Sequence, residues 1–213
     1  GLASAEAEEI EIHAMSFNIR LGVADDGPNH WDLRKELVFD VLRDHQPDVV
    51  GLQEAWKIQI DALNAAFPEF GMIGRSRQED PEKGEWCPIL YRKDKFEVVS
   101  EGTFWLSDNP EKEGTMSWGN SIPRICTWGR FKDKNTGRTF FLYNTHFDHQ
   151  SQASREKSAV LCRERIAARK PGDEAAIFMG DLNAGEGNLA NKTLGESLRD
   201  TFGELHPGVK LRG

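Results

Sequence analysis

The sequence predicts an α/β domain in which helices cover two packed β-sheets. Apolar segments with the two-residue period of a strand alternate along the chain with segments that have a helical period. The strand segments outnumber the helical ones, and such a pattern is buried when helices cover two packed sheets. The length of 213 residues suits one sizeable domain rather than two.

The first part of the chain alternates predicted strands and helices. Residues 10–18 alternate apolar and polar side chains, which predicts a strand. Residues 48–54 form an apolar run that ends in polar groups, which predicts a buried strand. Helices are predicted over 33–44 and 56–66, and a proline follows each of them. The apolar stripe of the first helix consists of Leu33, Leu37, Val38, Val41 and Leu42.

The second part of the chain is richer in strands. A helix is predicted over 151–168, where Ser151 or Ser154 can cap the first turn. Residues 175–179 predict another buried strand, and residues 134–137 have the composition of a hairpin turn. The remaining short strands are predicted over 87–91, 96–100, 102–106, 124–132 and 139–144.

The formal net charge of −8 disfavours long DNA or RNA as a substrate, because non-specific binding to nucleic acid depends on Lys and Arg side chains that neutralise phosphates. A local basic patch would be enough, so nucleic acid stays open as a partner. No apolar run approaches the roughly 20 residues that a membrane span needs. Residues 1–9, which we expect to be flexible, suit the mature end of a secreted or periplasmic protein and a cytoplasmic terminus equally.

The three cysteines, Cys87, Cys126 and Cys162, are widely separated in the sequence. They include no CxxC pair, so a zinc knuckle is not predicted. We expect three small buried residues, although the spacing leaves a single disulfide open.

Polar side chains of one kind follow three predicted strands. Asn18 follows the first, Gln53 and Glu54 follow the strand over 48–54, and Asp181 with Asn183 follows the last. Any one of them alone would suit a turn or a cap. Hard cations such as Mg²⁺ prefer oxygen ligands and keep several waters, so one or two carboxylates and a substrate phosphate suffice. The repetition therefore predicts a metal site.

A fourth polar cluster, residues 144–149, follows the last of the short strands. On a strand, Asn144, His146 and Asp148 would share one face. His146 beside carboxylates suits a hydrogen-bond donor to a phosphoryl oxygen, and a structural histidine bonded to backbone is the alternative. For His149, support of the site and a plain surface position both stay open.

The polar motifs follow one another in the order 15–20, 47–54, 144–148 and 180–183. Together they resemble the successive motifs of the endonuclease/exonuclease/phosphatase family, which includes deoxyribonuclease I, inositol polyphosphate 5-phosphatases and deadenylases. Each motif alone is weak, but the order of all four is specific. Residues 89–93 and 102–107 are also similar to a bacterial subgroup near the deadenylase-like branch.

The resemblance implies a four-layer α/β sandwich, with two packed mixed β-sheets flanked by helices, over residues 10–213. It implies hydrolysis of a phosphodiester or phosphomonoester by an activated water, with Mg²⁺ or Mn²⁺ as cofactor. Glu54 resembles the principal metal ligand of the family. Asn18 resembles the amide that helps hold metal and phosphate.

The resemblance also assigns catalytic roles. His146 resembles the histidine that contacts the phosphate, Asp181 the acid that orients the nucleophile, and Asn183 the amide beside it. Glu85 stands where deoxyribonuclease I has a glutamate that steadies this histidine.

Four remaining side chains receive weaker assignments. Arg124 is a candidate for binding the substrate phosphate, and a surface salt bridge is its alternative. Asp148 is a further candidate substrate contact, and His149 is grouped with Glu85 as a supporting residue.

The family motifs end with an Asp-containing strand and a Ser-Asp-His triplet, whose histidine is the general base. Neither follows Asp181 here, and His206 lacks the preceding Ser-Asp. We therefore expect the domain to be incomplete at its C-terminal end, with a natural chain that continues beyond Gly213. A short variant with a silent or rebuilt site is the alternative.

The leading functional hypothesis is a metal-dependent phosphoesterase that acts on a small or medium phosphorylated substrate. A nuclease or deadenylase on single-stranded nucleic acid is the second hypothesis, and a catalytically silent binding module of the same fold is the third. In the second, bases would stack on interleaved side chains, namely Arg75, Arg77, Trp86, Trp105 and Trp118. The sequence leaves the substrate and the oligomeric state open.

Overall fold

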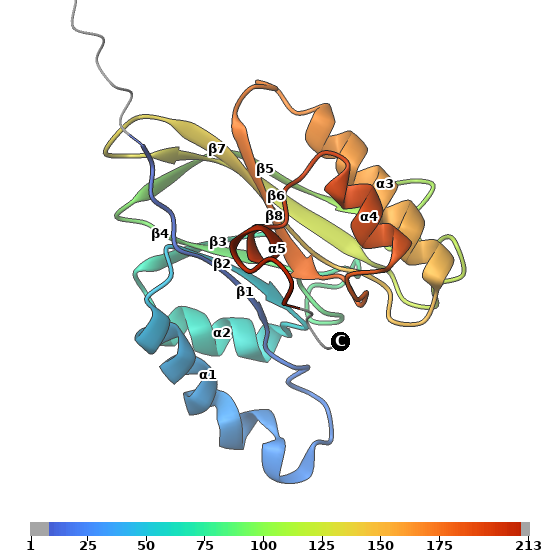
Figure 1. The fold of residues 1–213 in the computed structure, drawn as a ribbon. Coiled ribbons are helices and arrows are strands. Elements are labelled where there is room, and N and C mark those ends of the chain that lie inside the picture. The colour runs from blue at the N-terminus through green and yellow to red at the C-terminus, as the bar shows by residue number, and fades with distance from the viewer. Residues whose placement is uncertain (1–8, 210–213) are drawn as a thin grey trace, which may run out of the picture.

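The computed structural model describes residues 9–209, and two four-stranded mixed sheets pack face to face within them. Helices lie on the two outer faces, so the layers follow one another as helix, sheet, sheet and helix (Figure 1). The predicted α/β sandwich is thereby confirmed. Residues 1–8, most of the segment predicted to be flexible, and Gly213 at the end of the predicted domain lie outside the described residues. Glu9 is described and is exposed.

The first sheet has the strand order β1-β2-β4-β3. Strand β1 runs parallel to β2, while β4 is antiparallel to both of its neighbours. The short β3 was not predicted, because its Gly71 and its length of four residues give no clear strand period. The strands are β1 (Ala14–Asn18), β2 (Val49–Gln53), β3 (Phe70–Ile73) and β4 (Ile89–Arg92).

Helices α1 (Trp31–His45) and α2 (Lys57–Ala66) cover the outer face of this sheet and share one apolar core with it. The stripe expected on α1 is only partly correct. Val38 and Leu42 are 6% and 4% exposed, but Leu33 and Leu37 are 71% and 68% exposed. The helix begins two residues earlier than predicted and buries the face that carries Trp31, so these two leucines point to solvent.

The second sheet has the strand order β5-β6-β7-β8, and its last pair, β7 and β8, is parallel. The strands predicted over 96–100 and 102–106 are one strand, because a bulge between Val98 and Ser100 absorbs the irregular period. The predicted hairpin turn joins β6 to β7, where Gly137 has a φ of 74°. The strands are β5 (Phe96–Trp105), β6 (Ile125–Asp133), β7 (Thr139–His146) and β8 (Ala175–Asp181).

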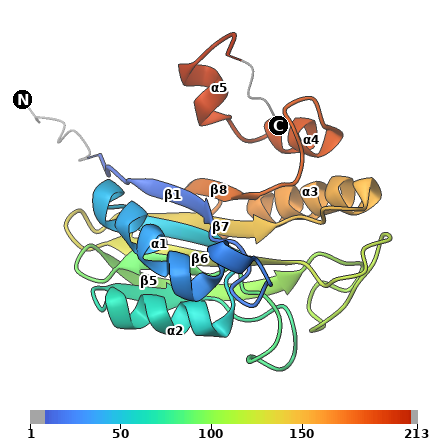
Figure 2. The same ribbon diagram turned by 90° about the horizontal axis from the view of Figure 1, so that it is seen from below.

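Helices α3 (Gln152–Ala167) and α4 (Leu189–Gly195) cover the outer face of the second sheet. Ser151 caps α3 by accepting a hydrogen bond from the amide of Ser154, as predicted. The short 3₁₀ helix η1 (Gly27–Asn29) and α5 (Thr201–Leu205) complete the fold, and α4 and α5 lie beyond β8 (Figure 2). These short elements were not predicted, because fewer than two helical turns show no clear period.

The two sheets meet in an apolar layer to which Val49 and Ile89 contribute from one side and Phe131, Leu142 and Met179 from the other. Each of the three cysteines is buried and free. Within residues 9–209 no helix has the length and apolarity needed to cross a membrane.

A polar link joins the sheets at the end of β7. The amide nitrogen of Asn144 donates to the carbonyls of Leu52 and Pro88 at 2.8 and 2.9 Å, and its oxygen accepts from Gln53 at 2.7 Å. Gly51 makes this approach possible, because a Cβ there would lie 2.6 Å from Met179 Sδ and 2.7 Å from the Asn144 side chain. The link fixes the position of one sheet's strand ends against the other's.

Candidate active site

The carboxyl ends of four strands lie at one end of the sandwich. The parallel pair β1 and β2 brings Asn18 opposite Gln53, and the parallel pair β7 and β8 brings His146 opposite Asp181. Strands β1 and β8 contact each other across the two sheets. Motifs that are far apart in the sequence therefore meet at this edge.

Asn18 joins two carboxylates that come from different sheets. Its amide nitrogen donates to Glu54 Oε1 and to Asp181 Oδ2, both at 2.9 Å. Its oxygen accepts from the backbone amide of Arg20 at 3.0 Å, which fixes the orientation of the amide group. Two carboxylates that share one neutral donor repel each other, so the arrangement favours a cation.

Three residues around these carboxylates have a left-handed backbone. Arg20, Glu54 and Asn183 have φ angles of 55°, 59° and 47°. Non-glycine residues rarely adopt this region, which costs on the order of 1 kcal/mol each, and such strain concentrates at functional sites. The left-handed turn at Glu54 aims its Oε2 at the amide of Leu21, with a hydrogen bond of 2.9 Å.

The donor set fits a hard divalent cation. Glu54 and Asp181 offer carboxylate oxygens, with side chains that are 18% and 33% exposed, and Asn18 offers an amide oxygen. Within residues 9–209 no group of three or more His, Cys, Asp or Glu side chains has metal-binding geometry. A cation here would therefore use few protein ligands and keep waters, as Mg²⁺ does.

His146 lies between two carboxylates at the end of β7. Its Nε2 is 3.0 Å from the amide nitrogen of Asn183 and 3.8 Å from Asp181 Oδ2, and its Nδ1 is 3.7 Å from Glu85 Oε2. The same Asn183 nitrogen donates to the carbonyl of Phe147 at 3.0 Å, so it is a donor and Nε2 accepts. The ring proton then belongs on Nδ1, which faces Glu85.

Gly180 allows β8 to end against β7 at this point. Its φ is 152°, and a Cβ at this position would lie 2.2 Å from the carbonyl oxygen of Thr145. Only glycine fits this contact, and the residue that follows it is Asp181.

Glu85 is held by an arginine that the sequence did not assign to the site. Arg77 binds it with two hydrogen bonds of 3.0 and 3.2 Å, and the two side chains are only 10% and 13% exposed. Burial raises the pKa of the Glu85 carboxyl, but His146 and Arg77 outweigh burial and lower it below its ordinary value. Glu85 therefore stays ionised beside the histidine.

The burial of Arg77 corrects part of the base-stacking hypothesis. Arg77 is 8% exposed and Trp105 is 2% exposed, and the Trp105 indole nitrogen donates to the Arg77 carbonyl at 2.9 Å. Neither side chain has a face free for a nucleobase. Arg77 and Glu85 are eight residues apart, at the two ends of a loop that the Arg77 amide closes by donating to the Glu85 carbonyl at 3.0 Å. This opposite-charge spacing is the sequence signal that could have indicated their pairing.

Arg124, Asp148 and His149 form a second group. Arg124 Nη2 is 2.9 Å from His149 Nδ1, and Arg124 Nε is 3.5 Å from Asp148 Oδ2. The Arg124 and Asp148 side chains are 4% and 1% exposed, whereas His149 is exposed. The predicted substrate contacts of Arg124 and Asp148 stay predictions.

Asp148 also shapes the turn after β7. Strand β7 ends at His146, so Asp148 and His149 do not continue the predicted strand alternation. Asp148 Oδ1 accepts from the amides of Gln150 and Ser151 at 3.0 and 2.7 Å. Burial raises the pKa of the Asp148 carboxyl, but these amides and Arg124 outweigh burial and lower it.

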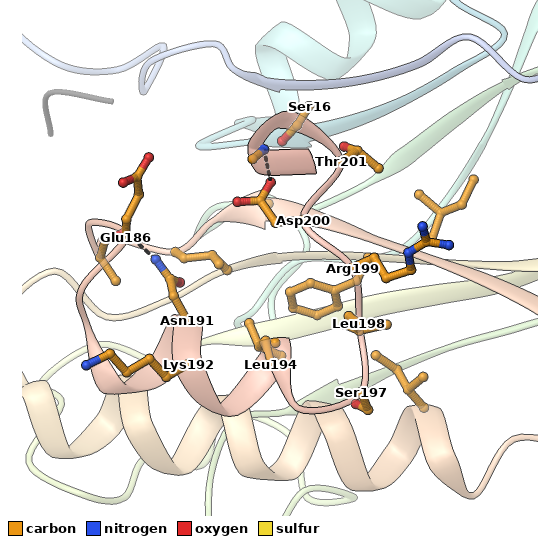
Figure 3. Close-up of a pocket in the computed structure, with 18 of the residues that line it drawn as sticks. Ser16, Glu186, Asn191, Lys192, Leu194, Ser197, Leu198, Arg199, Asp200 and Thr201 are labelled. Atoms are coloured by element: carbon orange, nitrogen blue, oxygen red, sulfur yellow. Dashed lines mark hydrogen bonds between the residues drawn. The ribbon is translucent and has the colours of Figure 1, made fainter. Parts of the chain in front are cut away.

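The cluster opens into a groove of about 1920 Å³ whose lining includes Asn18, Asp181 and Asn183. Figure 3 shows Ser16 of β1, Lys192 of α4 and Asp200 among the side chains that line this groove. His206, which follows α5, lines the same groove and packs against Phe202 with ring centroids 4.6 Å apart and the rings tilted by 45°. That a general base lies beyond Gly213 stays a prediction.

The fold is similar to that of known proteins. An endonuclease/exonuclease/phosphatase from Bacteroides vulgatus is 39% identical with a TM-score of 0.85, over 89% of this chain and 72% of that one. A mannosyl-6-phosphatase from Bacteroides thetaiotaomicron is 33% identical with a TM-score of 0.82, over 86% of this chain and 70% of that one.

An uncharacterized protein, L388, of Acanthamoeba polyphaga mimivirus is 27% identical over 160 residues. The match covers 72% of this chain but only 59% of that protein. The model of the Endonuclease/Exonuclease/phosphatase family matches residues 15–207. The chain therefore belongs to the Endonuclease/Exonuclease/phosphatase family.

Proposed function

We propose that this chain hydrolyses a phosphate ester of a small molecule with the help of Mg²⁺ or Mn²⁺. One observation carries the proposal. Two carboxylates from different sheets, Glu54 and Asp181, meet on the single amide nitrogen of Asn18, at 2.9 Å each, beside His146. Oxygen ligands next to a buried imidazole suit a cation and a phosphoryl group together.

Each side chain has a role in this proposal. Glu54 and Asn18 hold the cation, which supplies positive charge against the phosphoryl oxygens. Asp181 orients the attacking water through its Oδ2. With substrate bound, Asn183 and His146 would turn from each other to the phosphoryl oxygens, and His146 would then carry a proton on both ring nitrogens in order to donate from Nε2. Glu85 holds the ring of His146 in place.

The proposed substrate is a phosphate monoester of a sugar-like alcohol. The acidic balance of −8 favours a small substrate over a long nucleic acid. The 33% identical mannosyl-6-phosphatase from Bacteroides thetaiotaomicron supports the same class. The nuclease hypothesis loses two of its five stacking side chains to burial, so we do not put it first.

A substrate panel tests the proposal. Wild type is assayed with Mg²⁺, with Mn²⁺ and with EDTA on mannose 6-phosphate, p-nitrophenyl phosphate and bis(p-nitrophenyl) phosphate. We expect cation-dependent turnover of the monoesters, which Glu54→Ala abolishes. Glu97→Ala, at an exposed glutamate on β5, is the matched control.

Two results would contradict it. Turnover by Glu54→Ala equal to that of wild type would remove the metal ligand from the proposal. Absence of all turnover, with binding of single-stranded RNA at low salt, would favour a nucleic-acid-binding module instead.

A further inference from the structure

We propose that His149 donates a hydrogen bond from its Nε2 to a hydroxyl or ring oxygen of the substrate's alcohol, and that Arg124 and Asp148 hold it in the form that donates. The inference rests on the proposed function and deepens it. It reverses the roles that the sequence suggested. The buried Arg124 and Asp148 now support the site, and the exposed His149 contacts the substrate.

The tautomer of His149 follows from its partner. The guanidinium of Arg124 has donors and no acceptor, and it stays protonated in proteins. Its Nη2 lies 2.9 Å from His149 Nδ1, so Nδ1 must accept. The ring proton of His149 therefore belongs on Nε2, the nitrogen on the other side of the ring from Arg124.

Arg124 is fixed before any substrate binds. Its Nε lies 3.5 Å from Asp148 Oδ2, and the two side chains are 4% and 1% exposed. Asp148 is anchored in turn by the amides of Gln150 and Ser151. A donor held by buried charges loses little freedom on binding, which is the benefit of preorganisation.

His149 follows His146 by three residues, in the turn after β7, and Arg124 links it to the surroundings of Glu85. Arg124 lies close enough to Glu85 to help lower the pKa of that carboxyl, and Glu85 is the partner of His146. His146 is 6% exposed, whereas His149 is exposed in the turn that follows the strand. Since the proposed function places His146 against the phosphoryl group, the more exposed His149 is left for the alcohol part of the substrate.

The chemistry of the donor selects the class of ligand. A second phosphate would be bound best by a cationic donor. The Nε2–H of a neutral imidazole suits an uncharged oxygen, such as a hydroxyl of a polyhydroxylated alcohol. His149 then distinguishes sugar phosphates from esters whose alcohol lacks such oxygens.

A pair of substrates tests this contact by activity. We expect His149→Ala to lower kcat/KM for mannose 6-phosphate about tenfold, the effect of one lost hydrogen bond, and to leave p-nitrophenyl phosphate unchanged. His149→Gln, whose amide can replace the Nε2 donor, restores most of the loss. His45→Ala, an exposed histidine on α1, is the control. Equal losses on both substrates, or no loss on either, would overturn the inference.

A second measurement does not need turnover. Nitrogen-15 NMR of Asp181→Asn with Mg²⁺, in which the ester can bind through the cation with little turnover, reports whether the proton of His149 lies on Nε2. We expect the Nε2–H tautomer, and a shift of Nε2 on adding mannose 6-phosphate but not inorganic phosphate. A proton on Nδ1, or no shift with mannose 6-phosphate, glucose 6-phosphate or glycerol 1-phosphate, overturns the inference. If wild type hydrolyses none of these esters, the proposed function fails separately.

Discussion

The two halves of the site are held in different ways. The carboxylate half, made of Asn18, Glu54 and Asp181, depends on one shared amide, and its carboxylates are 18% and 33% exposed. The ion-pair half is buried and cross-linked by charge pairs, and consists of Arg77, Glu85, His146, Arg124 and Asp148.

This difference separates reactivity from stability. Carboxylates that repel each other in partial contact with solvent contribute little to folding, but they are suited to attract a cation. Buried ion pairs are strongly destabilised when one partner is removed, because the other charge is left without compensation. Substitutions in the carboxylate half should therefore lower activity more than stability, and substitutions in the ion-pair half should lower the free energy of unfolding.

The largest expected effect is on activity, in the carboxylate half. Asp181→Asn removes the charge and keeps one acceptor oxygen, whereas wild type uses Oδ2 for Asn18 and Oδ1 for the amide of Asn183. Either partner that loses its acceptor lies at the open end of the site, where water can replace the bond. We expect kcat to fall by at least about a hundredfold, while the urea midpoint stays within error of wild type. A midpoint that falls with the activity would show that this half also supports the fold.

The next effect is on stability, in the ion-pair half. Asp148→Asn keeps an oxygen for the turn but leaves the Arg124 charge unpaired at 4% exposure. We expect the free energy of unfolding to fall by about 3 kcal/mol in urea. Adding Arg124→Met should return part of this loss, and a double variant as unstable as the sum of the single ones would contradict the pairing.

The pH dependence of stability should also come from the ion-pair half. The pKa of Glu85 is lowered below its ordinary value of 4.5 in the folded protein. A lowered folded pKa gives stability that is present above the unfolded pKa and is lost as the pH falls through the folded pKa. The difference in unfolding free energy between wild type and Glu85→Gln should therefore narrow from pH 7 to pH 3. A constant difference would contradict the assignment.

The smallest effect concerns Arg20, which is 56% exposed and has its Nη1 3.7 Å from Glu54 Oε2. Its charge competes with a cation for that carboxylate. Arg20→Gln should tighten Mn²⁺ binding about threefold, within the range of an exposed ion pair, and change stability by less than about 0.5 kcal/mol. Weaker binding would mean that Arg20 orients Glu54 instead.

The sequence could predict the carboxylate half because its members stand at strand ends. Asn18, Glu54 and Asp181 each follow a strand with a clear period, and parallel strands place their carboxyl ends at one edge. The order of the four motifs indicated the family, and the family resemblance assigned the role of each residue. The two-sheet fold followed from the same periods.

The ion-pair half depends on contacts that no period encodes. Arg77 and Glu85 come from a loop, and their pairing is visible only when the loop is closed. Asp148 was expected on a strand face, but the strand ends at His146 and the carboxylate turns inward to Arg124. Elements as short as α4 and α5 carry too few turns to be predicted.

The central claim is that the carboxylate half binds a divalent cation. Mn²⁺ titration followed by electron paramagnetic resonance measures this directly in wild type, Glu54→Gln and the control Glu97→Gln. The account predicts one saturable site in wild type and in Glu97→Gln, and loss of that site in Glu54→Gln while the fold is retained. Equal binding by all three proteins would contradict it.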